Sequence, residues 1–271
     1  MKWLILPLLL LASQQTQATP EQDRQTIRDF YQQIFPHVPF TGYADGVYAF
    51  DSDARSSWEA IKEFPPYAFV LEKGQQLFNT PFPNGTYYSD CFQNKGRGIA
   101  QNYPFWDEQK QQITTLPSAI NDCRIKNQQA LLTYGTADII ALQSYIADSS
   151  RGKIIHTEIP TSALKAYDAG KTYFYQRRGQ LNFSCASCHV DNAGKFLRSE
   201  LLSPALGHTS HWPAYRLNTG EVNTLHSRFK VCNQLIRAKV DAAQSPALRQ
   251  LEFFLSYMAN GLPLNGPSIR K

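Results

Sequence analysis

The chain has 271 residues and a formal net charge of +5 at pH 7. This length suits one large domain or two of ordinary size. The charge is only mildly basic and no Lys/Arg cluster stands out along the chain, so the composition gives no indication of nucleic-acid binding.

The first residues predict a secretory signal peptide. Lys2 supplies one positive charge, a short apolar run ends at Ala12, and polar residues follow up to Ala18. The run is too short to cross a bilayer, which disfavours an uncleaved membrane anchor. We expect cleavage near Ala18, leaving a periplasmic protein with no membrane span.

Export makes the cysteines informative, because an oxidising compartment pairs or modifies idle thiols. Each cysteine is therefore expected to have a role. The five are Cys91, Cys123, Cys185, Cys188 and Cys232.

Two pairs of segments indicate an internal repeat. The stretch Leu142-Gln143-Ser144-Tyr145-Ile146-Ala147 is echoed by Phe254-Leu255-Ser256-Tyr257-Met258-Ala259, and each lies in an apolar stretch with helical spacing. Upstream, the segment around Gly74 resembles the one around Gly170. The offset is 96 between the glycines and 112 between the tyrosines. Only three of the six residues in the first match are identical, so coincidence is the alternative.

The repeat predicts two homologous, mainly helical domains after a signal peptide at 1–18, namely 19–152 and 153–271. Thr161-Ser162 is expected to cap a helix from Ala163 to Arg177, and Ser245-Pro246 to start a helix that contains Leu251 to Met258. Loops rich in Gly, Pro and Asn lie between them. Short helices joined by long loops suit a domain organised around a prosthetic group.

The segment Cys185-Ala186-Ser187-Cys188-His189 has the C-x-x-C-H pattern of c-type haem attachment. Cysteines three apart on a helical turn point the same way, so both can form thioethers, and the next residue directs its imidazole at the iron. The pattern predicts one covalent haem c on Cys185 and Cys188, with His189 as an iron ligand.

Two other roles of this pattern are less favoured. A thioredoxin-like redox pair belongs at a βα junction and would leave the following histidine accidental. A zinc site needs further regularly spaced ligands, and only scattered histidines are present.

The second iron ligand is less clear from the residues. Met258 lies on the apolar face of the closing helix, where core packing is the favoured role. His208, His211 and His226 follow the haem motif, but each alone is more often a surface or loop histidine.

Cys232 is the better candidate, because it is the thiol left over after the haem pair and any Cys91 to Cys123 bridge. Thiolate is an established haem ligand. A thiolate also needs a positive environment, and Arg228 lies four residues earlier on the same face of an expected helix. The alternative, an inert buried cysteine beside a solvated arginine, is equally compatible with the residues.

At Arg228-Phe229-Lys230-Val231-Cys232 the chain resembles the SoxA family, the catalytic cytochrome subunits of the periplasmic sulfur-oxidation system. The resemblance runs from about Gly74 to the C-terminus. Its specificity comes from R-x-x-x-C and W-P-x-Y-R together with C-x-x-C-H. Further matching stretches are Thr80-Pro81-Phe82, Gly98 to Pro104, Trp212 to Arg216, and Asn260 to Pro267.

The resemblance implies two cytochrome c-like domains and an L-cysteine S-thiosulfotransferase, which couples thiosulfate oxidatively to a cysteine of a SoxYZ-like sulfur-carrier protein. It implies that His189 and Cys232 are the axial haem ligands and that Cys232 occurs as a persulfide. It also implies that Arg228 binds substrate, so that Arg228 and Cys232 form the catalytic pair.

The first domain departs from two-haem members of the family. Cys91 is followed by Phe92-Gln93-Asn94-Lys95, with no second Cys and no His at the required places. The chain therefore resembles the one-haem branch, in which Cys91 and Cys123 would form a disulfide worth about 3 to 4 kcal/mol. Two free thiols are the alternative.

Coupling thiosulfate to a thiol removes two electrons, whereas one haem iron passes them singly. A SoxX-like monohaem cytochrome is therefore the expected partner in a heterodimer, passing electrons on to cytochrome c. Three other functions stay open: a thiosulfate dehydrogenase that forms tetrathionate, a simple electron-transfer cytochrome, and a noncatalytic haem-binding interaction module.

Overall fold

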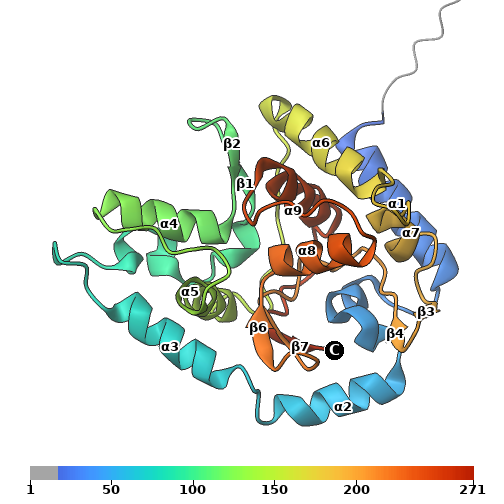
Figure 1. Cartoon of the computed structure of the whole chain (residues 1–271), viewed down its shortest axis with the longest axis horizontal. Helices are drawn as coiled ribbons and strands as arrows, with labels where there is room; N and C mark the ends of the chain where they lie inside the picture. Colours follow the sequence, from blue (N-terminus) through green and yellow to red (C-terminus); the bar gives the residue numbers. More distant parts are fainter. Residues whose placement is uncertain (1–17) are drawn as a thin grey trace, which may run out of the picture.

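The structure is a computed structural model that describes residues 18–271. The predicted signal peptide lies outside the described residues, apart from Ala18. α-Helices joined by long loops dominate, which confirms the mainly α fold class (Figure 1). In this part of the chain no helix has the length and hydropathy needed to cross a membrane. The helices are α1 (Pro20–Ile34), α2 (Ser52–Lys62), α3 (Ala68–Asn79), α4 (Leu116–Lys126), α5 (Ala137–Asp148), α6 (Leu164–Tyr175), α7 (Cys185–His189), α8 (Leu225–Leu235) and α9 (Pro246–Met258).

Strands and 3₁₀ turns are short. The strands form two antiparallel hairpins and one three-stranded sheet with the order β6-β5-β7, in which β7 runs parallel to β5. They are β1 (Phe105–Asp107), β2 (Gln112–Thr114), β3 (Phe196–Leu197), β4 (Glu200–Leu201), β5 (Ala214–Arg216), β6 (Glu221–Asn223) and β7 (Ser268–Arg270). The 3₁₀ segments are η1 (Phe40–Ala49), η2 (Tyr88–Asp90), η3 (Gln93–Gly96), η4 (Ala100–Asn102) and η5 (Thr161–Ala163).

Two helix pairs repeat the same close crossing. A Cβ added at Gly74 of α3 would lie 2.1 Å from the carbonyl oxygen of Ala141 in α5. A Cβ added at Gly170 of α6 would lie 2.0 Å from the carbonyl oxygen of Gln250 in α9. Only glycine lets the backbones approach this closely, so the two repeated glycines mark equivalent positions in two units.

The contacts also correct the register of the repeat. Ala141 and Gln250, the residues beneath the two glycines, are 109 positions apart, whereas the matching tyrosines are 112 apart. The same shift of 109 relates Thr115 to Thr224, the residues that cap α4 and α8. The two shifts differ by three residues, which is about one helical turn. Residues three apart share a helix face, so the apolar residues of the two helices match in the sequence alignment at either shift.

Separate hydrophobic cores form in the two halves. The core of the first half includes Phe78, Ile120 and Ile146, and that of the second includes Phe174 and Phe254. Helix α1 adds its apolar face to the second core, although it comes first in the chain. Its Asp23 accepts hydrogen bonds from Tyr167 at 2.9 Å and from Lys171 at 2.7 Å. The boundary after residue 152 stays a prediction.

One of the two expected helix starts is confirmed. Ser245 caps α9, where its Oγ accepts from the amide of Leu248 at 3.4 Å, with Pro246 in the first turn. Thr161 and Ser162 do not cap α6 but form the 3₁₀ turn η5 before it, and α6 ends at Tyr175 rather than Arg177. The preceding Pro160 holds an extended backbone, so a tight turn replaces the expected cap.

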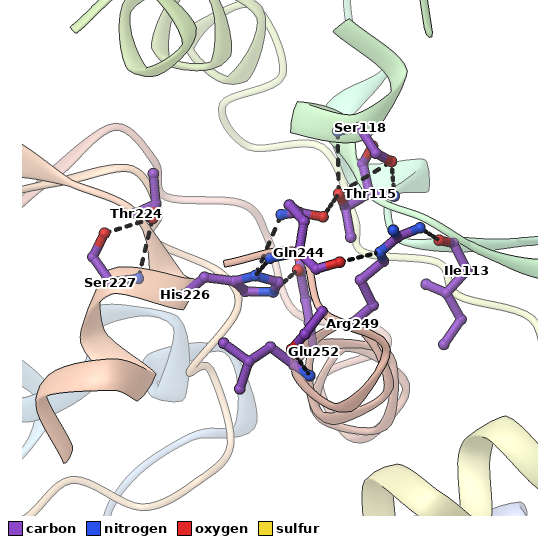
Figure 2. Close-up of polar contacts among 11 residues, drawn as sticks. Ile113, Thr115, Ser118, Thr224, His226, Ser227, Gln244, Arg249 and Glu252 are labelled. Atoms are coloured by element: carbon purple, nitrogen blue, oxygen red, sulfur yellow. Dashed lines mark hydrogen bonds and ion pairs between the residues drawn. The ribbon is translucent and has the colours of Figure 1, made fainter. Parts of the chain in front are cut away.

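A buried polar network joins the two halves (Figure 2). The Thr115 hydroxyl donates to Gln244 Oε1 at 2.6 Å, and the Gln244 amide donates to His226 Nδ1 at 3.0 Å. The proton of this imidazole therefore sits on Nε2, which lies 2.8 Å from Glu252 Oε2. The network fixes the start of α8 against α4 and α9.

Cys91 and Cys123 are joined by a disulfide, with their Cα atoms 5.6 Å apart and 32 positions between them in sequence. Cys123 lies on α4 and is buried in the first core. The bond ties α4 to the loop that follows η2. It therefore stabilises the first half mainly by restricting the unfolded chain.

Replacing both Cys91 and Cys123 by Ser should lower the free energy of unfolding by about 2 to 5 kcal/mol. The activity of the protein that remains folded should not change, because the bond lies in the first half. Denaturant titration of the oxidised wild type and the double variant measures the effect. Equal stability, or two reactive thiols in wild-type protein isolated without reductant, would contradict the prediction.

Candidate functional site

The haem motif folds as one helical turn. Helix α7 spans Cys185–His189, and Ser184 caps it by accepting from the Ser187 amide at 3.0 Å. In return the Ser187 hydroxyl accepts from the Ser184 amide at 3.1 Å. This reciprocal pair fixes the start of a very short helix. Cys185 and Cys188 consequently lie on the same side of the turn, as two thioether bonds require.

His189 is held by its backbone and by one ring nitrogen. Its Nδ1 lies 2.7 Å from the Ser203 carbonyl oxygen, so Nδ1 carries the proton and Nε2 is left to bind a metal. Its own carbonyl accepts a hydrogen bond from the hydroxyl of Tyr31. The Ala205 amide donates to the same hydroxyl at 3.0 Å. Tyr31 thus links α1 both to the end of α7 at His189 and to the loop that contains Ala205.

The pKa of His189 is lowered to about 4, mainly by burial. The hydrogen bond to the Ser203 carbonyl opposes this effect, and the positive charge of Arg228 adds to it. The imidazole is therefore neutral at pH 7. Neutral imidazole is the form that binds a metal.

Helix α8 carries the other candidate residues. Thr224 caps it, accepting from the Ser227 amide at 3.2 Å. Arg228 and Cys232 lie one turn apart on the same face, as the sequence predicts, and both are half-buried.

The thiols of α7 and α8 lie near one another. The pKa of the Cys185 thiol is raised to about 12, mainly by burial, with a contribution from the electrostatic interaction with the Cys232 sulfur. Burial also raises the pKa of Cys188, again with a contribution from Cys232. The segment that leads into α7 also contacts the end of α8, where the Leu181 amide donates to the Ile236 carbonyl at 3.3 Å, so the helix that carries Cys232 lies beside the haem motif.

Other histidines take different positions. The His208 ring lies edge-on to that of His189, with 4.3 Å between the centroids, and its Nε2 is 3.2 Å from Ser203 Oγ. This is too close for the two rings to lie on opposite faces of one haem. His226 belongs to the network between the halves, and His211 is buried beside Trp212. Met258 is packed in the second core.

These donors fit haem c. Two thiols share one helical turn, a neutral imidazole keeps one nitrogen free, and a third soft donor comes from α8. Apolar side chains are exposed beside them, with Phe183 at 42%, Val231 at 41% and Leu235 at 59%. Exposed apolar groups beside the donors suit the faces of a porphyrin ring.

The equivalent place in the first half holds the disulfide. By the shift of 109, Cys123 corresponds to Cys232 and Ala119 corresponds to Arg228. Cys91 precedes Cys123 as the haem motif precedes Cys232, and it bonds to Cys123 directly. The first half therefore lacks the imidazole, the second attachment thiol and the arginine.

Sequence reasoning missed three contributors to the site. Tyr31 and Ser203 hold His189 through contacts between residues that are distant in sequence, which local sequence patterns do not predict. Burial lowers the pKa of Arg216, at the end of β5, and electrostatic interactions with Arg228 and Cys232 place this residue near them. Arg216 belongs to the W-P-x-Y-R stretch of the resemblance, which marked the residue without giving it a role.

Comparisons with known proteins identify the family of the chain. A family model described as SoxA/TsdA, cytochrome c domain, matches the chain twice, at residues 73–155 and 169–264. The L-cysteine S-thiosulfotransferase subunit SoxA of Allochromatium vinosum is 48% identical over 259 residues, covering 94% of this chain and 92% of that protein. Its counterpart from Chlorobaculum tepidum is 44% identical over 258 residues, covering 94% and 89%.

A solved structure is also similar. A chain of the crystal structure of SoxXA from P. pantotrophus superimposes with a TM-score of 0.75 at 27% sequence identity, covering 83% of this chain and 86% of that chain. The two matches of the family model fall on the two helical units described above, and the curated relatives extend over nearly the whole chain. The chain therefore belongs to the SoxA family, within the SoxA/TsdA group of cytochrome c proteins.

Proposed function

We propose that this chain is the catalytic subunit of an L-cysteine S-thiosulfotransferase that couples thiosulfate to a cysteine of a SoxYZ-like carrier protein. The observation that carries the proposal is that α8, which holds Arg228 and Cys232, ends against the segment that leads into the haem motif of α7. The Leu181 amide of that segment donates to the carbonyl of Ile236 at the end of α8 at 3.3 Å. The names of the curated relatives support the same activity.

In the proposed reaction the outer sulfur of thiosulfate forms a bond to the carrier sulfur. The carrier S–H bond breaks, and one proton and two electrons leave, giving the carrier-bound S-thiosulfonate. The forked guanidinium of Arg228 would bind the sulfonate oxygens. Cys232, a soft thiolate, would hold the outer sulfur and bind iron.

Cys185 and Cys188 would hold one haem c through thioethers, and His189 and Cys232 would bind its iron. A bound haem c accepts electrons one at a time. The disulfide in the first half supports a single haem per chain. Removal of two electrons then calls for a second haem, which a SoxX-like monohaem cytochrome would supply before electrons pass to cytochrome c. The similarity to a chain of SoxXA supports such a heterodimer.

A periplasmic location would follow from the predicted signal peptide at residues 1–18. It suits both the disulfide and the covalent haem, which are typical of an oxidising compartment.

A thiosulfate dehydrogenase that forms tetrathionate is the second candidate, because the matching family model covers both SoxA and TsdA proteins. The two functions differ in their acceptor. With its cytochrome partner, the purified chain should consume thiosulfate only when a carrier thiol is present. Thiosulfate oxidation without the carrier, with release of tetrathionate, would favour the dehydrogenase.

Mass spectrometry of the mature protein should find one covalent haem. Cys185→Ala or Cys188→Ala should seriously impair maturation, because both thioethers come from this turn. The Cys91→Ser/Cys123→Ser double variant is the control and should keep its haem. Two haems on the wild type, or none after expression with haem-attachment machinery, would disprove the assignment.

Cys232→Met should separate iron ligation from sulfur chemistry. Methionine is itself a haem ligand, so the variant can keep six-coordinate iron while it loses the thiolate. Coupling of thiosulfate to the carrier should disappear even where absorption spectra show the haem retained. Coupling at the wild-type rate would leave an electron-transfer cytochrome as the better interpretation.

Arg228→Ala should lower kcat/KM for thiosulfate by roughly one to two powers of ten. This corresponds to a loss of about 1.5 to 3 kcal/mol of transition-state stabilisation, because a charged hydrogen bond to the anion is lost. Arg228→Lys should be less harmful, since it keeps the charge but loses the forked geometry. Lys230→Ala removes a charge from the opposite side of α8 and is the control. Equal kinetics in Arg228→Ala and Lys230→Ala would argue against substrate binding by Arg228.

A further inference from the structure

Arg216 ends the central strand of the small sheet beside α8. Its carbonyl accepts from the Gly220 amide at 2.8 Å, and the following amide, that of Leu217, donates to the Arg270 carbonyl at 2.8 Å. Strand β5 pairs with β6, which leads directly into α8 through Thr224 (Figure 1). Arg216 and Arg228 therefore belong to one continuous strand-strand-helix unit.

The guanidinium of Arg216 is half-buried and has no hydrogen bond or ion pair to any residue between 18 and 271, and the same is true of Arg228. In every other arginine of this range that is at least half-buried, the side chain donates at least one hydrogen bond. Those arginines are Arg24, Arg28, Arg55, Arg124, Arg178, Arg249 and Arg270. Of the two unpartnered arginines, Arg228 lies one helical turn from Cys232 on α8, and Arg216 interacts electrostatically with both Arg228 and Cys232.

Their charges also act on each other. The pKa of Arg216 is lowered to about 10. Burial is the largest cause, and the positive charge of Arg228 is the next. Glu200 on β4 and Cys232 oppose this, but Glu200 forms no ion pair with Arg216. Two neighbouring cations without a counter-ion repel each other, and a bound dianion would relieve the repulsion.

We propose that Arg216 is a second anion-binding residue for thiosulfate, acting with Arg228 as a pair of guanidiniums that hold the sulfonate end while the outer sulfur faces Cys232. The proposal rests on the proposed function and adds to it. Three sulfonate oxygens offer more acceptor positions than one bidentate arginine can fill. Two arginines also select a dianion over monoanions, because each negative charge meets its own cation.

The test uses holoprotein in complex with its partner cytochrome, with sulfate as an unreactive dianion that has the shape of the sulfonate group. Sulfate binding is measured by calorimetry in Arg216→Gln and Arg216→Lys. Lys230→Gln is the matched control, since it removes the same charge from the side of α8 turned away from Arg228. KM and kcat for thiosulfate are measured alongside the haem spectrum.

Arg216→Gln should weaken sulfate binding and raise the KM for thiosulfate, each by about ten- to a hundredfold, with an unchanged haem spectrum. Arg216→Lys should fall between this variant and the wild type, and Lys230→Gln should stay within about twofold of the wild type. In anion-free buffer Arg216→Gln should unfold at the same temperature as the wild type or higher, because the repulsion is gone. If Arg216 had a structural role, its replacement would instead lower the unfolding temperature.

Wild-type sulfate affinity in Arg216→Gln would overturn the proposal. If Arg216→Gln does not fold, wild-type sulfate affinity in Arg216→Lys overturns it instead, because the forked geometry is then unimportant. A wild type that binds sulfate through both arginines but couples no thiosulfate to a carrier thiol would refute the proposed function and leave the anion site standing.

Discussion

The close crossing of α6 and α9 at Gly170 is the constraint on which the second half depends. Because the backbones of α6 and α9 touch there, the end of α6 at Tyr175 has a fixed position relative to α9. A loop then connects it to α7, which begins at Cys185. Helix α9 in turn supports Glu252 and Arg249, whose contacts hold the start of α8. The donors on α7 and α8 are therefore positioned by one scaffold, although about 40 residues of loop and hairpin separate them.

The two halves use this scaffold for different purposes. In the first half the cysteine on α4 bonds to Cys91, and a covalent bridge stabilises the unit. In the second half the cysteine at the same place, Cys232, is free and interacts electrostatically with the two further thiols, Cys185 and Cys188. The difference rests on few residues: the first half lacks one cysteine and one histidine, and it has Ala119 in place of Arg228. A unit with a disulfide is stabilised by a covalent bond within its own chain and needs no prosthetic group to complete its core.

Local patterns predicted the parts of the site that are close in sequence. The haem turn, the pairing of Arg228 with Cys232 along α8, and the cap at Ser245 all depend on spacing within a few residues. Contacts across the chain were not predictable in this way. Tyr31 reaches His189 over 158 positions, and no periodicity announces it. The shifted register of the repeat has a related cause, because matching apolar residues one turn apart on a helix cannot distinguish two alignments.

Both ends of the chain contribute to the second half. Helix α1 contacts the carbonyl of His189 through Tyr31, and the last strand, β7, inserts beside β5 next to the C-terminus (Figure 1). This sets an order of assembly. The second half, which holds the haem motif, can complete its fold only after the C-terminal residues of α9 and β7 have been synthesised, although α1 is made first.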